Sequence, residues 1–394
     1  MRRLYLFTAT FPYGQAESFI ETEIIFLSKE FEHVVIIPLS GKNDNKRDVP
    51  INCEVLEPII KSKWQRYVYG LYNCKTLDVF LNDFIKKKVY TNFASLKTWL
   101  VAYYITNLLL KSKSLMSRLE KASSEDVIYF YWGVGSSLLT PFITNNHAKK
   151  VVRFHGEWDL WEESSGNYAA LRSKIANSID LAVFISKAGL HYFDQKYADI
   201  SLKKSICYLG TVDHGVSKRS DDGVFRLLSC SSVIPLKRIH LIFESLQLID
   251  GIEVEWTHIG DGIGFKELRQ LTQKSKSNIS IRLMGSIPNQ AVFFYYRNNS
   301  IDAFINVSST EGLPVTLMEA ISFDVPIIAT NVGGTSEIVN SETGILLTSN
   351  PSCQEIANAI HDIRKLELNP KLFWDKNFDA NKNYPEFINI ISLL

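Results

Sequence analysis

The feature that most constrains the fold of this 394-residue chain is a series of short apolar runs, each followed by small or polar residues. Several segments between these runs, such as 239–249 and 353–363, have the apolar spacing of helices. Strands that alternate with helices indicate parallel sheets covered on both faces, so we predict an α/β fold. The predicted strands are Leu4–Thr8, His33–Pro38, Val127–Trp132, Lys150–Phe154, Leu181–Ile185, Ile206–Leu209, Phe225–Ser229, Val254–His258, Ile279–Met284, Ile301–Val307, Val325–Thr330 and Ile345–Thr348.

The length of the chain favours two domains. The polar segment Thr211–Gly223 interrupts the pattern and is the best candidate for a linker. We therefore predict an N-terminal domain at 1–210 and a C-terminal domain at 211–375, each with about six strands. Residues 376–394 are predicted to form a helix whose apolar face packs back on the N-terminal domain.

Charge is balanced overall, at a net +1, but residues 61–121 carry twelve lysines and arginines against three acidic residues, with eleven aromatic residues among them. Cationic helices with aromatic edges bind anionic membrane surfaces. Interleaved aromatic residues can also stack on bases, but we expect no nucleic-acid partner. The remaining alternative is a large helical insertion whose aromatic residues belong to the core. Membrane contact and this core insertion both stay open.

The five cysteines are scattered and odd in number, which favours neither a disulfide framework nor a zinc site. This usage is typical of a reducing compartment, so we expect a cytoplasmic protein. No apolar run approaches the length that spans a bilayer. Any membrane association through 61–121 would therefore be peripheral, on the inner face.

The most informative motif follows the apolar run Ala303–Val307. Glu311 lies in the predicted strand-to-helix loop, Pro314 takes the first helical position, and Glu319 lies one to two turns into the helix. Eight helical steps would separate the two carboxylates by roughly 12 Å. That exceeds the ~5–9.5 Å of a glycosidase acid/base pair. The spacing suits two ends of one extended, hydroxyl-rich ligand; the alternative is a surface helix with two solvated glutamates.

The glutamate, seven residues and second glutamate resemble the signature of the retaining GT-B glycosyltransferases of family 4. The resemblance covers nearly the whole chain and is strongest over 229–344. Asp324-Val325-Pro326 stands where the family commonly has Gly-x-Pro, and Gly333-Gly334-Thr335-Ser336-Glu337 matches its glycine pair and further glutamate. The resemblance implies two Rossmann-like parallel-sheet domains that face each other across a cleft.

The resemblance also implies roles for the residues of the motif. Glu319 would accept hydrogen bonds from the two ribose hydroxyls of a nucleotide, and Glu311 would meet hydroxyls of the transferred sugar. A carboxylate accepts two hydrogen bonds at once, which matches a vicinal diol. The N–H groups at the start of the helix can cradle the diphosphate or the sugar, which adds four donor-binding candidates, Gly312, Leu313, Val315 and Thr316.

A second motif, Ser231–Arg238, resembles the family pattern of an arginine followed five residues later by a lysine, both at the leaving diphosphate. Lys237 matches the lysine, whereas Ser232 stands at the arginine position and supplies no charge. Arg238 is a further donor-binding candidate, although a neighbour in sequence need not point the same way. The alternative for both cations is a solvated helix start. By the same resemblance, Gly285 ends a strand whose backbone meets the base.

In the N-terminal half, Arg153-Phe154-His155-Gly156 resembles the strand end whose histidine faces the transferred sugar. The alternative is a structural histidine. Asp159 lies close by in sequence, and its role stays open. The loop after the first strand contains Gly14, where the backbone could approach a phosphate or an acceptor; the alternative is an ordinary turn.

The resemblance therefore implies a retaining hexosyltransferase that moves a sugar from a nucleoside diphosphate sugar to an acceptor hydroxyl. Glu311, Lys237 and His155 would be its catalytic residues, and no bound metal or other cofactor is expected. The basic segment and the family's habit favour a lipid-linked glycan in surface polysaccharide biosynthesis as the acceptor. Two alternatives stay open: a non-catalytic nucleotide-sugar sensor or scaffold, favoured by Ser232, and a GT-B sugar-nucleotide epimerase.

Overall fold

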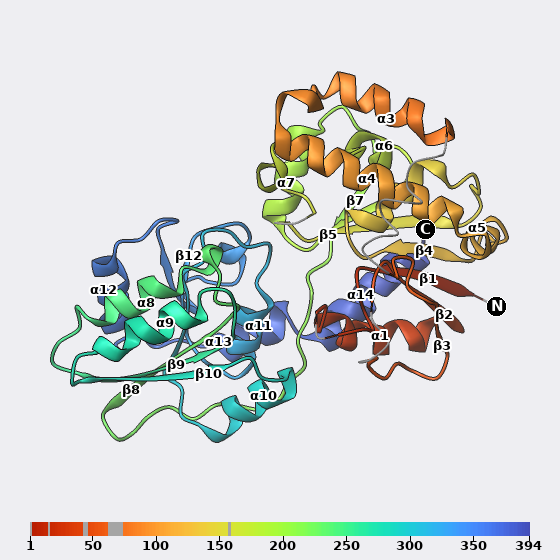
Figure 1. Ribbon diagram of the computed structural model, residues 1–394. Helices are drawn as coiled ribbons and strands as arrows, with labels where there is room; N and C mark the ends of the chain where they lie inside the picture. Colours follow the sequence, from red (N-terminus) through yellow and green to blue (C-terminus); the bar gives the residue numbers. More distant parts are fainter. Residues whose placement is uncertain (1, 15, 42–45, 62–73, 157–158) are drawn as a thin grey trace. The chain divides into compact units, whose positions relative to one another are not determined.

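The computed structural model describes residues 2–14, 16–41, 46–61, 74–156 and 159–394. The chain divides into two compact units, one formed by 1–207 with 384–394 and the other by 208–383. Each unit is built on one parallel sheet with helices on both faces (Figure 1). The α/β architecture predicted from the alternating apolar runs is thus confirmed.

The sheet of unit 1 has seven strands in the order β3-β2-β1-β4-β5-β6-β7, and every pairing in it is parallel. The central strands are buried along almost their whole length because both faces of the sheet are covered. The strands are β1 (Arg3–Thr8), β2 (His33–Pro38), β3 (Cys53–Val55), β4 (Val127–Phe130), β5 (Lys149–Phe154), β6 (Leu181–Phe184) and β7 (Lys203–Ile206).

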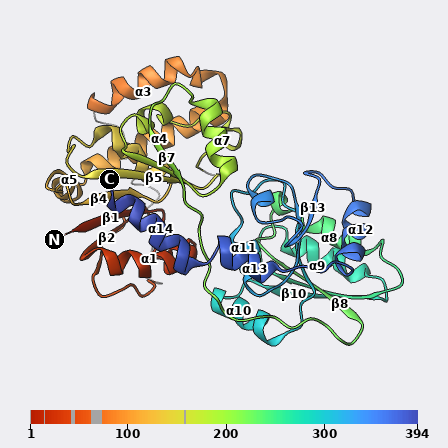
Figure 2. The same cartoon turned by 180° about the vertical axis from the view of Figure 1, so that it is seen from behind.

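The two faces of this sheet bury separate apolar clusters. On one face lie α3 (Cys74–Lys86), η2 (Val89–Thr91), α4 (Phe93–Lys111), α5 (Lys113–Glu120), η3 (Gly135–Phe142), η4 (Glu162–Ser165), α6 (Arg172–Ala176) and α7 (Lys187–Lys196). The other face is covered by α1 (Phe19–Glu30) and by α14 (Ala380–Ser392), as Figure 2 shows from behind.

The end of the chain completes unit 1. From Tyr384 onward α14 belongs to this unit, and Phe387 packs into the cluster on the α1 face. The Phe387 ring lies 4.1 Å from the guanidinium carbon of Arg153, a fully buried residue on β5. Nη1 of Arg153 pairs with Oε2 of Glu23 on α1 at 2.5 Å. One buried ion pair and one aromatic ring therefore join β5, α1 and α14.

The sheet of unit 2 has six parallel strands in the order β10-β9-β8-β11-β12-β13. They are β8 (Val224–Cys230), β9 (Glu253–Ile259), β10 (Ile279–Gly285), β11 (Ala303–Asn306), β12 (Ile327–Thr330) and β13 (Gly344–Leu347). The helices are η5 (Pro235–Lys237), α8 (Ile239–Leu246), α9 (Phe265–Leu271), η6 (Thr272–Lys274), α10 (Asn289–Asn298), α11 (Val315–Ser322), η7 (Thr335–Glu337), α12 (Cys353–Ile363) and α13 (Pro370–Asn377).

Two strands of unit 1 differ from the prediction, which gave six strands. The edge strand β3 was not predicted, because it is short and only half-buried and so lacks a clear apolar run. The last strand was expected at 206–209 but lies at 203–206. The strand begins with two lysines, which an edge position tolerates. The apolar run 206–209 therefore starts at the last residue of the strand and continues beyond it.

Two further details also differ. The segment 211–223, predicted as a linker, is part of unit 2, where the Thr211 and Ser217 N–H groups donate to the carbonyls of Phe378 and Phe323. Pro314 lies one position earlier than predicted: it is the N-cap residue of α11 and not the first residue of the helix.

Candidate functional site

In unit 2 the predicted donor residues gather where the strand order reverses, between β8 and β11. Parallel α/β sheets bind ligands outside the carboxyl ends of their strands at this switch point. Lys237 follows β8 and Glu311 follows β11, so adjacent strands bring the two side chains to the same edge of the sheet. The sheet order thus explains why residues from two distant motifs meet.

Lys237 and Glu311 form an ion pair, with 2.6 Å between Nζ and Oε1. The Lys237 side chain is 20% exposed and that of Glu311 is 8% exposed. The same Oε1 atom accepts a hydrogen bond from Nδ2 of Asn306 at 3.1 Å, so Asn306 orients the carboxylate from the end of β11. This pair places one cation and one acceptor within reach of a single ligand.

The helix α11 begins at Val315, four residues after Glu311. The first N–H of this helix to donate within it is that of Leu317, which donates to the Pro314 carbonyl at 3.1 Å. The N–H groups of Val315 and Thr316 precede that bond, in the first turn, where a helix has no carbonyls of its own to offer. Such N–H groups and the positive end of the helix dipole favour a negatively charged ligand. The loop before them is pinned by the Gly312 carbonyl, which accepts from the Gly334 N–H at 2.8 Å.

Glu319 lies on the buried side of α11 and is 8% exposed. Burial raises the pKa of its carboxyl to about 7, although a hydrogen bond with Asn289, at the start of α10, acts in the opposite direction. Cys230, the last residue of β8, and Tyr296 on α10 are its electrostatic neighbours. A buried carboxyl of this kind is available to a ligand hydroxyl, and its charge is sensitive to pH near neutrality.

Arg238 does not share the orientation of Lys237. Its backbone is left-handed, at φ 48°, and its guanidinium donates to the carbonyls of Val307, Ser308 and Ser349 and to Oδ1 of Asn350, at 2.7 to 3.0 Å. These contacts brace the loop that carries Glu311. They do not support the predicted contact of Arg238 with the donor diphosphate.

Ser232 lies in the loop after β8, and Gly285 is the last residue of β10, with β9 between these two strands. Ser232 is exposed, and its carbonyl accepts from the Ile234 N–H. Gly285 has φ +70°, and its carbonyl accepts from the N–H of Gly260 at 2.8 Å. A Cβ on Gly260 would lie 1.9 Å from the Ser231 carbonyl oxygen, and its φ is +143°. Glycine at position 260 is therefore required for these loops to pack together.

In unit 1, His155 follows β5 and is held by Asp159. The N–H groups of His155 and Gly156 donate to Oδ1 of Asp159 at 2.9 Å, and Nδ1 of the imidazole lies 3.5 Å from Oδ2. Burial raises the pKa of Asp159, but the hydrogen bond and charge of His155, the Gly133 N–H and the charge of Arg172 outweigh it, so the pKa is lowered. Asp159 is therefore an ionised acceptor that orients His155.

Aromatic rings enclose the His155 imidazole. The ring centroids of Trp132 and Tyr131 lie 4.3 and 4.9 Å from that of His155, and Phe19 lies 6.2 Å away. Nε2 is buried and has no hydrogen-bond partner among the residues that the structure describes. With Nδ1 facing Asp159, Nε2 is the nitrogen that remains for a ligand.

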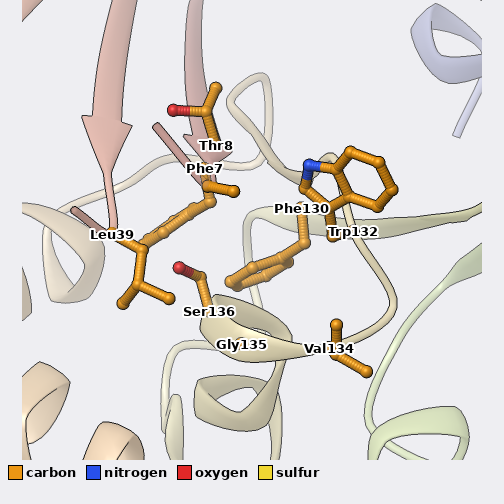
Figure 3. Close-up of a pocket in the computed structure, with 9 residues that line it drawn as sticks. Phe7, Thr8, Leu39, Phe130, Trp132, Val134, Gly135 and Ser136 are labelled. Carbon is orange, nitrogen blue, oxygen red and sulfur yellow. The ribbon is translucent and has the colours of Figure 1, made fainter. Parts of the chain in front are cut away.

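Unit 1 contains two neighbouring cavities. The first, about 350 Å³, lies at the carboxyl ends of β1 and β4, the switch point of this sheet, and the Trp132 indole forms part of its wall (Figure 3). The second, about 520 Å³, lies between α4 and residues 159–172 and shares Val134 and Gly135 with the first. Both are mainly apolar. Gly14, in the loop after β1, has φ +70° and open space around its Cβ position.

The basic segment is divided between core and surface. Phe80, Trp99 and Tyr103 are buried against one another, as the core interpretation expected. Leu77, Leu81 and Ile85 are exposed at four-residue spacing on α3, followed by Lys86, Lys87 and Lys88 and by exposed Tyr90 and Phe93. Residues 62–73 of this segment lie outside the described residues. No helix within the described ranges is both long and apolar enough to cross a membrane.

Four residues at these sites had no role assigned from the sequence. Asn306 and Asn289 orient the two glutamates of unit 2, and Glu17 and Trp132 shape the switch point of unit 1. Asparagine is common at strand ends and helix starts, so its presence at these positions does not by itself indicate a role in a site. Glu17 had one usable signal, an acidic residue close before the start of α1, at the end of the first loop.

Comparison with known sequences matches residues 215–377 to the family model described as glycosyl transferases group 1. The putative teichuronic acid biosynthesis glycosyltransferase TuaC of Bacillus subtilis is 31% identical over 151 residues, which cover 36% of each chain. The GtfA subunit of a UDP-N-acetylglucosamine–peptide N-acetylglucosaminyltransferase from Streptococcus agalactiae is 27% identical over 229 residues, covering 55% of this chain and 44% of the relative. The chain thus spans less than half the length of these relatives.

Solved structures resemble the whole chain. The lipopolysaccharide outer core galactosyltransferase WaaB matches all of it with a TM-score of 0.69 at 14% identity. Anabaena HepE, solved in complex with UDP and glucose, matches all of it with a TM-score of 0.64 at 16% identity. Sucrose-phosphate synthase from Thermosynechococcus elongatus matches 99% of it with a TM-score of 0.69 at 12% identity. The predicted GT-B fold, with two Rossmann-like units, is confirmed.

Proposed function

We propose that this protein is a glycosyltransferase that moves a sugar from a nucleoside diphosphate sugar to an acceptor hydroxyl with retention of anomeric configuration. The observation that carries the proposal is the Lys237–Glu311 pair, 2.6 Å apart at the switch point of unit 2 beside the N-terminus of α11. A cation, a carboxylate and helix N–H groups in one place match the charges and hydroxyls of such a donor. The match of 215–377 to group 1 glycosyltransferases supports it.

Each residue then has a defined part. Glu319 accepts hydrogen bonds from the ribose hydroxyls, Glu311 from hydroxyls of the transferred sugar, and Lys237 turns to the diphosphate. As the bond from the anomeric carbon to the phosphate oxygen breaks, the acceptor oxygen attacks from the same face, and its proton passes to the departing phosphate. Catalysis is then mainly positioning and charge stabilisation of the leaving group. His155 is the residue of unit 1 that we assign to sugar contact.

The acceptor that we propose is a lipid-linked glycan in surface polysaccharide assembly, and no bound metal is required. Two mainly apolar cavities in unit 1, of about 350 and 520 Å³, support an acceptor with an apolar part. The exposed stripe Leu77, Leu81 and Ile85, followed by three lysines, supports peripheral contact with an anionic membrane. Each lysine near such a surface contributes about 1 kcal/mol. TuaC is, by its name, a putative glycosyltransferase of teichuronic acid biosynthesis.

The experiment is a transfer assay with UDP- and GDP-sugars and lipid-linked acceptors, run beside the melting temperature of the protein with each nucleotide. Turnover by the wild type and its loss in Glu311→Gln would support the enzyme. A rise in melting temperature with UDP or GDP, without turnover on any donor and acceptor, would instead support the sensor alternative. Sedimentation with vesicles of phosphatidylglycerol, but not of phosphatidylcholine, tests the membrane contact; Lys86→Glu should weaken it.

A further inference from the structure

At the carboxyl end of β1, donors of the chain itself surround the carboxylate of Glu17. Its Oε2 accepts from the N–H groups of Thr10 and Phe11, both at 2.6 Å, and from the Thr10 hydroxyl at 3.1 Å. Its Oε1 accepts from the Ala9 N–H at 3.0 Å and from the indole Nε1 of Trp132 at 2.5 Å. An ionised carboxylate only accepts hydrogen bonds, so this set of donors suits it.

This cluster lies at the switch point of the sheet of unit 1. Successive backbone N–H groups at the end of a strand form a concavity for anions, and the switch point is where such sheets bind ligands. In unit 1 a buried side chain of the loop itself fills that concavity, since Glu17 is 7% exposed. Its backbone is left-handed, at φ 58°, which is uncommon for a residue with a side chain. The form of residues 9–11 therefore depends on Glu17.

The bond from Trp132 extends this dependence to His155. The indole and the imidazole lie 4.3 Å apart, and the indole N–H fixes the rotation of the ring that lies against His155. On its other side the imidazole is held by Asp159, 3.5 Å from Nδ1. One wall of the histidine is thus set by Asp159 and another, through Trp132, by Glu17. Figure 3 shows the Trp132 indole beside the cavity at the ends of β1 and β4.

We propose that Glu17 is a positioning residue for sugar transfer, acting through Trp132 on His155. This inference rests on the proposed function, because it assigns Glu17 to the step in which His155 meets the sugar. Loss of the Glu17 carboxylate leaves donor binding in unit 2 unchanged and displaces the imidazole.

The test compares Glu17→Gln and Trp132→Phe with the wild type. Turned either way, the amide of Glu17→Gln places its NH₂ group against the two or three donors at one oxygen, so at least two hydrogen bonds are lost. Trp132→Phe removes the N–H donated to Glu17 and keeps an aromatic ring against His155. Glu30→Gln is the matched control, because Glu30 lies at the end of α1 in an exposed ion pair with Arg2.

We expect Glu17→Gln to lower kcat by about 10²-fold, since a small misplacement of a reacting group has that effect. Trp132→Phe should lower kcat in the same direction but less. The donor KM and the melting shift with UDP should stay at wild-type values in both, as should all parameters of Glu30→Gln. A merely structural loss would change stability and leave kcat of the folded fraction intact.

Wild-type kcat in folded Glu17→Gln would overturn the inference, as would a loss of donor binding that accounts for the whole effect. Trp132→Phe decides the matter if Glu17→Gln does not fold. If the wild type transfers no sugar, the proposed function fails. The ring ¹⁵N shifts of His155 then test the positioning by itself: they should move in Trp132→Phe and not in Glu30→Gln, and unchanged shifts in Trp132→Phe would overturn it.

Discussion

At the switch point of each sheet a glutamate carboxylate is held, but by different kinds of group in the two units. Between β8 and β11 of unit 2, a lysine and a glutamate side chain meet at 2.6 Å, and the lysine is one-fifth exposed. Between β1 and β4 of unit 1, the Glu17 carboxylate is buried among backbone N–H groups, a hydroxyl and an indole. Both places hold an anion, but different groups neutralise or solvate it.

This difference indicates different tasks. A lysine on a flexible stem can turn from a carboxylate to a phosphate with little change in the backbone. Backbone N–H groups of a buried loop cannot turn without a change in the loop itself. Unit 2 is thus suited to exchange its internal partners for a ligand, whereas unit 1 is suited to keep one shape around His155.

The largest effect should come from removing the exchangeable pair. Glu311→Gln and Lys237→Ala should each lower kcat by about 10²–10³-fold, as the loss of a charge-stabilising group at a reacting centre does. Initial rates at saturating donor measure this. Lys365→Ala, an exposed lysine paired with Asp362 at the end of α12, is the control. Near-normal rates in both variants would mean that sugar transfer does not depend on the Lys237–Glu311 pair.

Replacement of a glycine by alanine should cost more stability in unit 2 than in unit 1. Gly260→Ala should lower the free energy of unfolding of unit 2 by about 3 kcal/mol, because its Cβ would lie 1.9 Å from a carbonyl oxygen at a disfavoured φ. Gly14→Ala in unit 1 meets open space and should cost about 1 kcal/mol for its φ alone. Urea denaturation measures both; equal effects would contradict this contrast.

Arg238 is bound to carbonyls of the loop, whereas Lys237 pairs with a single carboxylate, so the two cations should respond differently to substitution. Arg238→Ala should destabilise unit 2 by about 2 kcal/mol, because the carbonyls of two buried residues, Val307 and Ser308, lose a charged donor. Unlike Lys237→Ala, it should change kcat and donor KM together, through the loop that carries Glu311. Denaturation and steady-state kinetics measure this. A loss of kcat alone, at unchanged stability, would instead indicate contact with the diphosphate.

The smallest effect concerns pH. Because the pKa of Glu319 is about 7, its carboxyl is mostly neutral at pH 6 and mostly ionised at pH 8. The ionised form accepts the two ribose hydroxyls, so UDP should bind about tenfold more tightly at pH 8 than at pH 6. Titration calorimetry measures this. In Glu319→Gln the change in UDP affinity that is due to Glu319 should disappear, and any change that remains measures titration of the UDP phosphates. The same tenfold change in this variant would show that Glu319 is not its cause.

The sequence predicts most strands of both sheets because their residues are buried on both faces and form continuous apolar runs. The edge strands β3 and β7 of unit 1 lack such runs and were missed or displaced, whereas the edge strands β10 and β13 of unit 2 have apolar runs and were predicted. Predictions of local pattern therefore succeed where the strand itself contains an apolar run.

The site residues divide in the same way. Glu311 and Lys237 stand in motifs of recognisable spacing, but their contact spans 74 positions and depends on β8 lying beside β11. The direction of Arg238 depends on one left-handed backbone position, which its sequence does not indicate. Glu17 could not be assigned a role because one of its partners, Trp132, lies 115 positions away.

The helix α14 also sets an order of assembly. The strands of unit 1 are all made before residue 208, yet the face that buries Arg153 and Glu23 is covered in part by Phe387. Domains usually fold as the ribosome releases them, the first before the second. Here the first half of the chain stays unfinished while unit 2 is synthesised, and the part of α14 that is made after unit 2 completes the core of unit 1.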